Sequence, residues 1–478
     1  MYMLICGERR FSQAGKSITV YNPATHEAIE SVPDASTEDV DSAIKYAFEG
    51  FEKWSRTLLF ERIGIIRKFA DLIENNYETI AEIETREMGK PIMQSRSECR
   101  GAAETIREIS EHARTLNGEV LPISNLPSAE EDMLITVREP YGVVTAIVPF
   151  NYPISQCILK LVPALLMGNT VIVKPASEAP LAVIKLMELL YEAGLPEYAA
   201  QVVTGPGHSV GKQLCEDERI SVVSLTGSTL SGIQASMNAA GTLKHVLLEL
   251  GGNDPLIILK DADMDYAVSE AVVGRYGCAG QICCGSKRFL VHEDIVDEFT
   301  EKLTDALSKL KLGDPFDTET KIGPLVSIEA AERAEKQIKE SLEEGGRLLM
   351  GGRRLNESYI EPTVIRTERS MKILHDMEVF APVWPIISFK TIDEAIEIAN
   401  DTPYGLSSGC IGNDYRQLLK IAKEVKAGCV VLGGCGNYQT KDQGFGGIKM
   451  SGNAREGGHY CLEEFSRIKT IVFRKAFC

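Results

Sequence analysis

Short apolar runs alternate with amphipathic stretches between residues 141 and 225, and this alternation restricts the folds open to the chain. The runs are rich in β-branched residues, which is typical of strands buried on both faces of a parallel sheet. They occur at Tyr141–Pro149, Thr170–Val173, Ala200–Thr204 and Ile220–Leu225. The stretches between them are predicted to be helices, at Ile154–Leu166, Ala179–Ala193 and His208–Cys215. This order predicts a doubly wound, Rossmann-like α/β sheet.

The same alternation begins again after Gly252, so we expect a second α/β domain. The chain has 478 residues, which is too long for a single hydrophobic core. Predicted strands of the second domain fall at Leu256–Leu259, Arg288–Val291, Thr363–Ile365, Ile386–Phe389 and Cys429–Leu432. Near the N-terminus, helices are predicted from Ser36 to Lys53, from Arg56 to Met88 and from Ser95 to Leu116.

The charge and the cysteine content exclude several classes of protein. The formal net charge of −17 opposes binding to nucleic acid or to an anionic membrane. We find neither an apolar run of membrane-spanning length nor a signal peptide, so we expect a cytoplasmic protein. The 12 cysteines include no Cys-x-x-Cys pair, and neither they nor the 7 histidines show metal-ligand spacing. We therefore expect free thiols and no metal site.

Two segments carry the residue types of covalent acyl transfer. Cys283 lies among small residues in Tyr276–Gly285, and Glu249 precedes the turn Gly251-Gly252. A thiol that attacks and a carboxylate that activates water are two parts of such chemistry. The alternatives are an inert buried cysteine and a solvated surface glutamate. The second is disfavoured because leucines flank Glu249.

A third segment, Leu225–Gly232, follows a predicted strand and opens a predicted helix, the place where a doubly wound sheet binds phosphate. It lacks the Gly-x-Gly-x-x-Gly fingerprint, so a plain turn between strand and helix stays open as an alternative.

Seven motifs, in order and at matching spacings, resemble those of the aldehyde dehydrogenase superfamily, and the resemblance covers nearly the whole chain. The motifs are Pro149-Phe-Asn-Tyr-Pro153, Lys174-Pro-Ala-Ser177, Gly227-Ser-Thr-x-x-Gly232, Glu249-Leu-Gly-Gly252, Gly280-Gln-Ile-Cys283, Glu378-Val-Phe380 and Phe445-Gly-Gly-Ile-Lys-x-Ser-Gly452.

The resemblance implies a role for each reacting group. Cys283 is expected to attack the aldehyde, and Asn151 with the Cys283 N–H to stabilise the resulting oxyanion. Glu249 is expected to activate the water that hydrolyses the thioester. Its presence argues against the branch that passes the acyl group to coenzyme A, which remains an enzymatic alternative. The adjacent Cys284 is expected to serve only in packing, because it points elsewhere on a regular backbone.

The resemblance also implies a nicotinamide cofactor. Lys174 is expected to contact the adenine ribose, and Glu378 the nicotinamide ribose. Ser177 occupies the position where NAD-preferring members carry a glutamate that repels a 2′-phosphate. We therefore expect NADP to be accepted alongside NAD. The remaining expected cofactor residues are Val148, Pro149, Gly227, Ser228 and Phe380.

The substrate is expected to be a short hydroxy- or acidic aldehyde. The motifs resemble most closely the branch of lactaldehyde, phosphonoacetaldehyde and non-phosphorylating glyceraldehyde-3-phosphate dehydrogenases. Ile282 stands where phosphate-handling members carry arginine, which argues against a phosphorylated substrate. The alternatives are an NADP-linked succinate-semialdehyde dehydrogenase and a non-catalytic family member. Four arginines are left open as substrate contacts or structural groups, namely Arg96, Arg100, Arg107 and Arg275.

The resemblance implies a three-part architecture. Residues 1–118 and 139–248 would bind the cofactor, residues 249–443 would be catalytic, and residues 119–138 with 444–478 would form an oligomerisation element. The strand predicted at Ile468–Arg474 has no obvious local partner, so we expect it to complete the sheet of another subunit in a homodimer or homotetramer.

Overall fold

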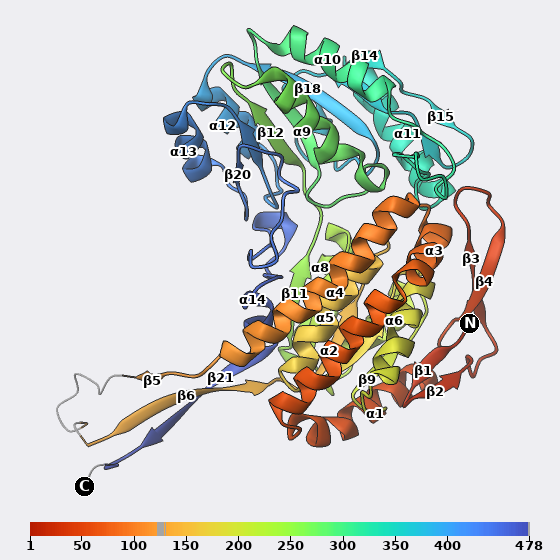
Figure 1. Cartoon of the computed structure of the whole chain (residues 1–478), viewed down its shortest axis with the longest axis vertical. Helices are drawn as coiled ribbons and strands as arrows, with labels where there is room; N and C mark the ends of the chain where they lie inside the picture. The colour runs from red at the N-terminus through yellow and green to blue at the C-terminus, as the bar shows by residue number, and fades with distance from the viewer. Residues whose placement is uncertain (122–128, 130, 477–478) are drawn as a thin grey trace.

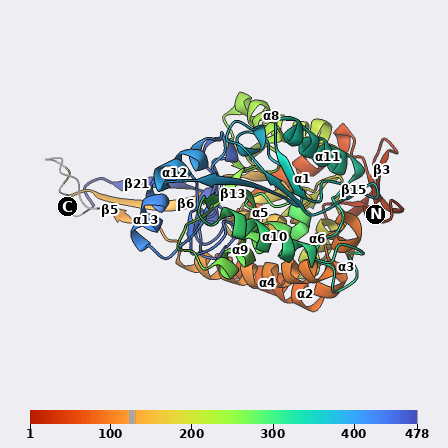
Figure 2. The same ribbon diagram turned by 90° about the horizontal axis from the view of Figure 1, so that it is seen from above.

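The computed structural model describes residues 1–121, 129 and 131–476 of the chain. Two α/β units lie one above the other, and an arm of strands extends away from the lower unit (Figure 1). The view from above shows the same arm at one end of the molecule (Figure 2). None of the helices in the described residues is long and apolar enough to span a membrane.

The first sheet has seven strands in the order β11-β10-β7-β8-β9-β1-β2. Its parallel strands are β7 Val143–Ile147, β8 Thr170–Lys174, β9 Ala200–Val202, β10 Ile220–Thr226 and β11 His245–Glu249. Strands β1 Met3–Ile5 and β2 Glu8–Arg10 add an antiparallel edge. The connecting helices are α5 Pro153–Leu166, α6 Leu181–Glu192, the π-helix η1 Gly207–Gly211 with α7 Lys212–Glu216, and α8 Thr229–Ala239. The predicted doubly wound sheet is confirmed, and β11, β1 and β2 were not predicted.

Four N-terminal helices complete the lower unit (Figure 1). They are α1 Thr37–Ser55, α2 Leu59–Asn75, α3 Tyr77–Met88 and α4 Ile92–Thr115. Ser36 caps α1 through a capping box with Asp39. Gly89 ends α3 with φ 77°, and a Cβ there would lie 2.4 Å from Pro324. The hairpin of β3 Ser17–Tyr21 and β4 Ala28–Pro33 lies beside these helices.

The second sheet has the order β14-β17-β18-β13-β12-β19-β20. Its parallel strands are β12 Asp254–Ile258, β13 Ser286–His292, β17 Thr363–Arg366, β18 Val383–Phe389, β19 Gly409–Ile411 and β20 Val431–Leu432. Strand β14 Arg347–Met350 is antiparallel to β17, and β15 Arg354–Leu355 pairs with β16 Tyr359–Ile360. The helices are α9 Met264–Tyr276, α10 Val296–Ser308, α11 Ile328–Glu343, α12 Ile392–Asn400 and α13 Tyr415–Glu424.

The C-terminal strand lies in the arm and pairs with a strand of its own chain. Strand β21 Ser466–Phe473 pairs antiparallel with β6 Met133–Pro140 of the same chain over its whole length, and β5 Val120–Leu121 lies on the other side of β6. The strand therefore has a partner in its own chain, far away in the sequence, and its expected role in completing the sheet of another subunit stays a prediction. The pairing joins residues more than 320 positions apart, such as Ser466 and Pro140, so no local pattern signals it. Residues 122–128 and 130, which fall in the expected oligomerisation segment 119–138, lie outside the described residues.

Candidate functional site

A cavity of about 490 Å³ lies above Cys283, between helices α4, α5 and α9 and the segment 437–445. Cys283 and Cys284 both line it. Besides apolar side chains, the carboxylates Glu98 and Glu456, and Lys441, the wall contains polar, uncharged residues, namely Gln94, Ser97, Thr105, Tyr152, Ser155, Gln156, Tyr276, Asn437, Gln439, Thr440 and Gln443. Such a wall offers hydrogen bonds to a small polar ligand.

Cys283 lies in a turn between a short 3₁₀ segment and strand β13. Just before it, Cys278 and Ala279 adopt left-handed backbone conformations with φ 48° and 52°. A hydrogen bond from the Cys284 thiol lowers the pKa of Cys283, and the nearby Lys287 ammonium lowers it further, whereas burial raises it. A lowered pKa increases the thiolate fraction, and the thiolate is the nucleophilic form.

Cys284 differs from the sequence expectation. It is buried, but its thiol also contacts Cys283, and that hydrogen bond is the main cause that raises the pKa of Cys284. The expectation assumed a regular backbone, on which neighbouring side chains point apart. The two cysteines lie in a turn, where they reach the same cavity.

Asn151 lies just before helix α5 and packs against the turn of Cys283. Its side chain is buried, and Nδ2 donates to the carbonyl oxygen of Gln281 at 2.8 Å. An amide nitrogen carries two N–H groups, so one remains for another acceptor. Gln281 is two residues before Cys283, so this hydrogen bond holds the predicted oxyanion donor close to the predicted nucleophile.

Glu249 ends strand β11 with an unpartnered carboxylate. The residue is 4% exposed, and neither oxygen has a hydrogen-bond partner among the described residues. Burial is the main cause that raises its pKa well above the usual value, and the nearby Glu456 carboxylate adds to the effect. Lys160, which pairs with Glu456, opposes it. A buried carboxylate with no donor to stabilise its charge is a strong proton acceptor once ionised.

Several predicted cofactor residues meet at the carboxyl ends of parallel strands, where doubly wound sheets bind ligands. Lys174 ends β8, and burial lowers its pKa to about 8. Its Nζ donates to the Pro175 carbonyl at 3.0 Å. Ser177 Oγ lies 3.5 Å from the Gly205 carbonyl. Ser228 caps α8 by accepting a hydrogen bond from the Ser231 N–H at 3.2 Å.

Of the other predicted cofactor residues, Val148 directly follows β7, Gly227 directly follows β10, and Phe380 belongs to the second unit. The Gly227 N–H donates to the Glu249 carbonyl at 3.1 Å, and the Val148 N–H to the Lys174 carbonyl at 3.0 Å. Pro149 follows directly on Val148. Phe380 meets Phe150 edge to face, with the ring centroids 6.1 Å apart.

Glu378 packs against the turn that follows Glu249. Its Oε1 accepts a hydrogen bond from the Gly252 N–H at 3.2 Å and lies 3.4 Å from Nζ of Lys287. A Cβ at Gly251 would lie 2.1 Å from the other Glu378 oxygen, so a larger residue there would displace this carboxylate. The turn after Glu249 therefore fits the carboxylate closely.

The four arginines considered as substrate contacts do not line the cavity. Arg96 pairs with Glu78, Arg107 pairs with Asp71 and Glu74, and the Arg100 guanidinium lies 4.4 Å from the ring centre of Tyr77. Arg275 is fully buried and donates to the backbone carbonyls of Gly280, Val379 and Val383. The first three belong to a surface helix face, and Arg275 holds the backbone.

Sequence reasoning missed the polar residues of the cavity wall. Gln439, Thr440 and Lys441 belong to a loop without periodicity or a motif, so no local signal marks them. Lys441 lies at the wall, but it pairs with Glu104, which neutralises its charge. No group of three or more His, Cys, Asp or Glu in the described residues is arranged to hold a metal ion.

Comparison with known proteins gives the same picture across the chain. A family model described as "Aldehyde dehydrogenase family" matches residues 11–471. A 3-sulfolactaldehyde dehydrogenase of Priestia aryabhattai is 37% identical over 457 residues, covering 96% of this chain and 95% of the relative. A lactaldehyde dehydrogenase of Methanococcus aeolicus is 37% identical over 461 residues, covering 96% and 97%. The mitochondrial succinate-semialdehyde dehydrogenase of Arabidopsis thaliana is 36% identical over 470 residues, covering 98% and 88%.

Solved structures agree with the fold. The crystal structure of an E. coli NADP-dependent enzyme matches with a TM-score of 0.96 and 33% identity, covering 99% of this chain and 98% of the other. Betaine aldehyde dehydrogenase from Staphylococcus aureus in complex with NAD+ matches with a TM-score of 0.95 and 34% identity, covering 99% and 94%.

Proposed function

Because the chain belongs to the aldehyde dehydrogenase family, it is an oxidoreductase that acts on an aldehyde with a nicotinamide cofactor, and we propose that its substrate is a short, neutral hydroxyaldehyde. The observation that carries this proposal is the cavity wall, which presents amide and hydroxyl groups and the carboxylates Glu98 and Glu456, and contains no arginine. Its one lysine is paired with Glu104. Relatives named lactaldehyde dehydrogenase support a hydroxyaldehyde.

The proposed chemistry uses three residues of this chain. The Cys283 sulfur attacks the carbonyl carbon, and the resulting oxyanion accepts hydrogen bonds from Asn151 Nδ2 and from the Cys283 N–H. A bound nicotinamide supplies the acceptor for the hydride that leaves this carbon. Glu249 then takes a proton from the water that attacks the thioester, and the carboxylic acid is released.

The residues around the cofactor site fit a dinucleotide. The Lys174 ammonium donates one of its three N–H groups to the carbonyl of the adjacent Pro175, so the other two remain for ribose hydroxyls. Glu378 offers its carboxylate to the second ribose, and the N-terminus of α8 at Gly227 and Ser228 suits a pyrophosphate. We assign Val148, Pro149 and Phe380 to the lining of the same cleft.

We further propose that the enzyme accepts NADP because Ser177 carries no charge. Ser177→Glu should lower kcat/KM for NADP relative to NAD by at least about fivefold, since a carboxylate near a 2′-phosphate repels it by about 1 kcal/mol even in a water-like medium. The ratio is measured from initial rates with each cofactor. Ser177→Gln is the control, because glutamine has the shape of glutamate without its charge, and it should change the ratio much less. An unchanged ratio in Ser177→Glu would place cofactor selection elsewhere.

A substrate panel tests the proposed function. We expect lactaldehyde and glycolaldehyde to give kcat/KM at least about tenfold above succinate semialdehyde and glyceraldehyde 3-phosphate, because burying an uncompensated anion costs more than 1.4 kcal/mol. Reduced cofactor is followed by its absorbance, with and without coenzyme A. Preference for an anionic aldehyde would contradict the neutral substrate and point to Lys441. Turnover that requires coenzyme A would contradict hydrolysis.

We also propose the three-part organisation and an oligomeric state. Residues 1–118 with 139–248 would bind the cofactor, residues 249–443 would carry the nucleophile, and residues 119–138 with 444–478 would join subunits as a homodimer or homotetramer. The support is the arm itself. Its strand β21 has an unpaired outer edge within the described chain and exposes Ile468, Val472 and Phe473.

A further inference from the structure

The side chain of Lys287 connects the turn of Cys283 with the carboxylate of Glu378. Lys287 is the second residue of β13, and its side chain is 1% exposed. Its Nζ donates to the carbonyl oxygens of Ile282, at 2.9 Å, and of Cys283. The same nitrogen lies 3.4 Å from Oε1 of Glu378. A single buried ammonium therefore contacts the turn that carries the nucleophile and a predicted cofactor ligand.

The charges that surround Cys283 make this ammonium important. Asp254 on β12 and Glu378 both oppose ionisation of the thiol, and Glu249 on β11 also faces it. Against these carboxylates, the groups that favour the thiolate are the Cys284 thiol, through its hydrogen bond, and the Lys287 charge. Asp254 and Glu378 are the carboxylates that face Lys287 itself. Without Lys287, the charged groups named here that act on Cys283 would all be carboxylates, and each would oppose formation of the thiolate.

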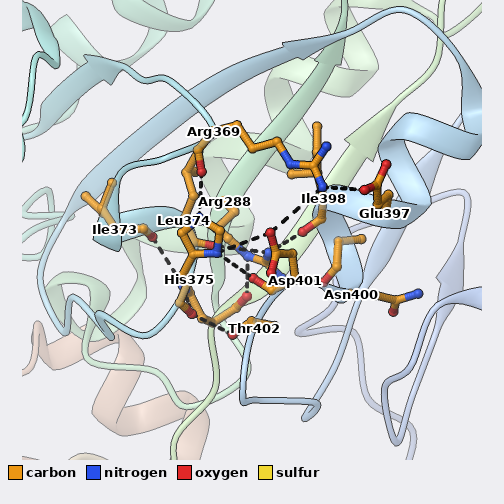
Figure 3. Close-up of polar contacts among 12 residues, drawn as sticks. Arg288, Arg369, Ile373, Leu374, His375, Glu397, Ile398, Asn400, Asp401 and Thr402 are labelled. Atoms are coloured by element: carbon orange, nitrogen blue, oxygen red, sulfur yellow. Dashed lines mark hydrogen bonds and ion pairs between the residues drawn. The ribbon is translucent and has the colours of Figure 1, made fainter.

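Arg288, the next residue on β13, holds the segment that leads to Glu378. Successive side chains of a strand point to opposite faces, so Arg288 points away from Lys287. The buried Arg288 guanidinium donates to the backbone carbonyls of Asn253, Leu374, Ile398 and Ala399 (Figure 3). Leu374 belongs to the segment that leads to Glu378. Arg288 therefore holds this segment, and Lys287 meets the carboxylate at its end.

We propose that Lys287 is a positioning residue for the oxidation, in that its ammonium stabilises the Cys283 thiolate and holds the reactive turn against Glu378. This role rests on the proposed function, in which Cys283 attacks and Glu378 binds ribose. The substitution Lys287→Met keeps most of the length of the side chain and removes both the charge and the N–H donors. Lys287→Arg keeps the charge, because a guanidinium stays protonated.

The test is the pH profile of Cys283 alkylation by iodoacetamide, measured on the full chain without aldehyde by mass spectrometry of the Cys283 peptide. In Lys287→Met we expect the profile to move up by about one pH unit, so that the rate near neutral pH falls about tenfold. Lys287→Arg should restore most of the rate. The KM for the cofactor should also rise in Lys287→Met, because Glu378 loses its partner. A profile that superimposes on that of the unaltered protein would overturn the proposal.

A second lysine that donates to two backbone carbonyls provides the control. Lys449 donates to the backbone carbonyls of Asn400, at 3.3 Å, and Thr402, at 3.1 Å, but it is not among the charges that act on Cys283. Lys449→Met should leave the alkylation profile unchanged, and an equal shift there would show general loosening and overturn the proposal. If Lys287→Met fails to fold, Lys287→Gln keeps an N–H donor without the charge and should give the same shift.

Alkylation needs no turnover, so it separates this proposal from the proposed function. Activity that survives the loss of the Cys283 thiol would refute the nucleophile while the profile of Lys287→Met still reports on the electrostatics. If the alkylation profile of Lys287→Met shifts but its rates of hydride transfer and hydrolysis are normal, Lys287 affects the Cys283 thiol but is not a positioning residue for the oxidation, and the proposal is contradicted.

Discussion

Replacing Cys283 with alanine is expected to abolish aldehyde oxidation while NADP still binds. The alanine cannot form the covalent adduct from which hydride leaves, and loss of a catalytic nucleophile lowers kcat by roughly four orders of magnitude or more. The predicted cofactor residues lie on other segments and keep their contacts. Reduced cofactor is followed by absorbance, and NADP binding by quenching of protein fluorescence. Cys6→Ala is the control, because Cys6 lies between β1 and β2, away from the cavity.

Residual activity in the Cys283 variant would have a specific candidate source. Cys284 lines the same cavity and contacts the Cys283 thiol. Activity lost only in the double variant Cys283→Ala/Cys284→Ala would move the nucleophile to Cys284. Activity that persists in both variants would end the covalent mechanism.

The fold could be predicted wherever strand and helix patterns are local. The buried runs that became β7, β8, β9 and β10 are each followed by a segment that the sequence predicts to be helical. Strand β11 was missed because its partly exposed start at His245 breaks the apolar run. The pairing of β21 with β6 was missed because it depends on contacts between distant parts of the chain, which no window of sequence contains.

The candidate site could be predicted only where a residue type carries its own chemistry. Cys283 and Glu249 stand out because a thiol among small residues and a carboxylate among leucines are unusual. Lys287 does not, since a lysine at the start of a strand is ordinarily solvated, and only the fold shows that it is buried against two backbone carbonyls. Arg275 shows the opposite error. Its charge made it a candidate for substrate binding, but its guanidinium donates hydrogen bonds to three backbone carbonyls instead.

The second large effect is expected for Glu249→Gln, which should leave a burst of reduced cofactor and slow the steady state. Attack and hydride transfer precede the step in which Glu249 takes a proton from water, so the first turnover proceeds and the thioester accumulates. Loss of a general base slows a step by about 10²- to 10⁴-fold. Glutamine keeps the shape of the side chain and cannot accept the proton. Rapid mixing resolves the burst from the steady state.

The pH dependence gives this prediction a second readout. Burial and Glu456 raise the pKa of Glu249, and only the ionised carboxylate acts as a base. The steady-state rate of the unaltered enzyme should therefore fall as the pH drops through that raised pKa, well above the range of an ordinary carboxyl. Glu249→Gln should lose this dependence. Loss of the burst as well would mean that Glu249, whose charge also acts on Cys283, already takes part in forming the adduct.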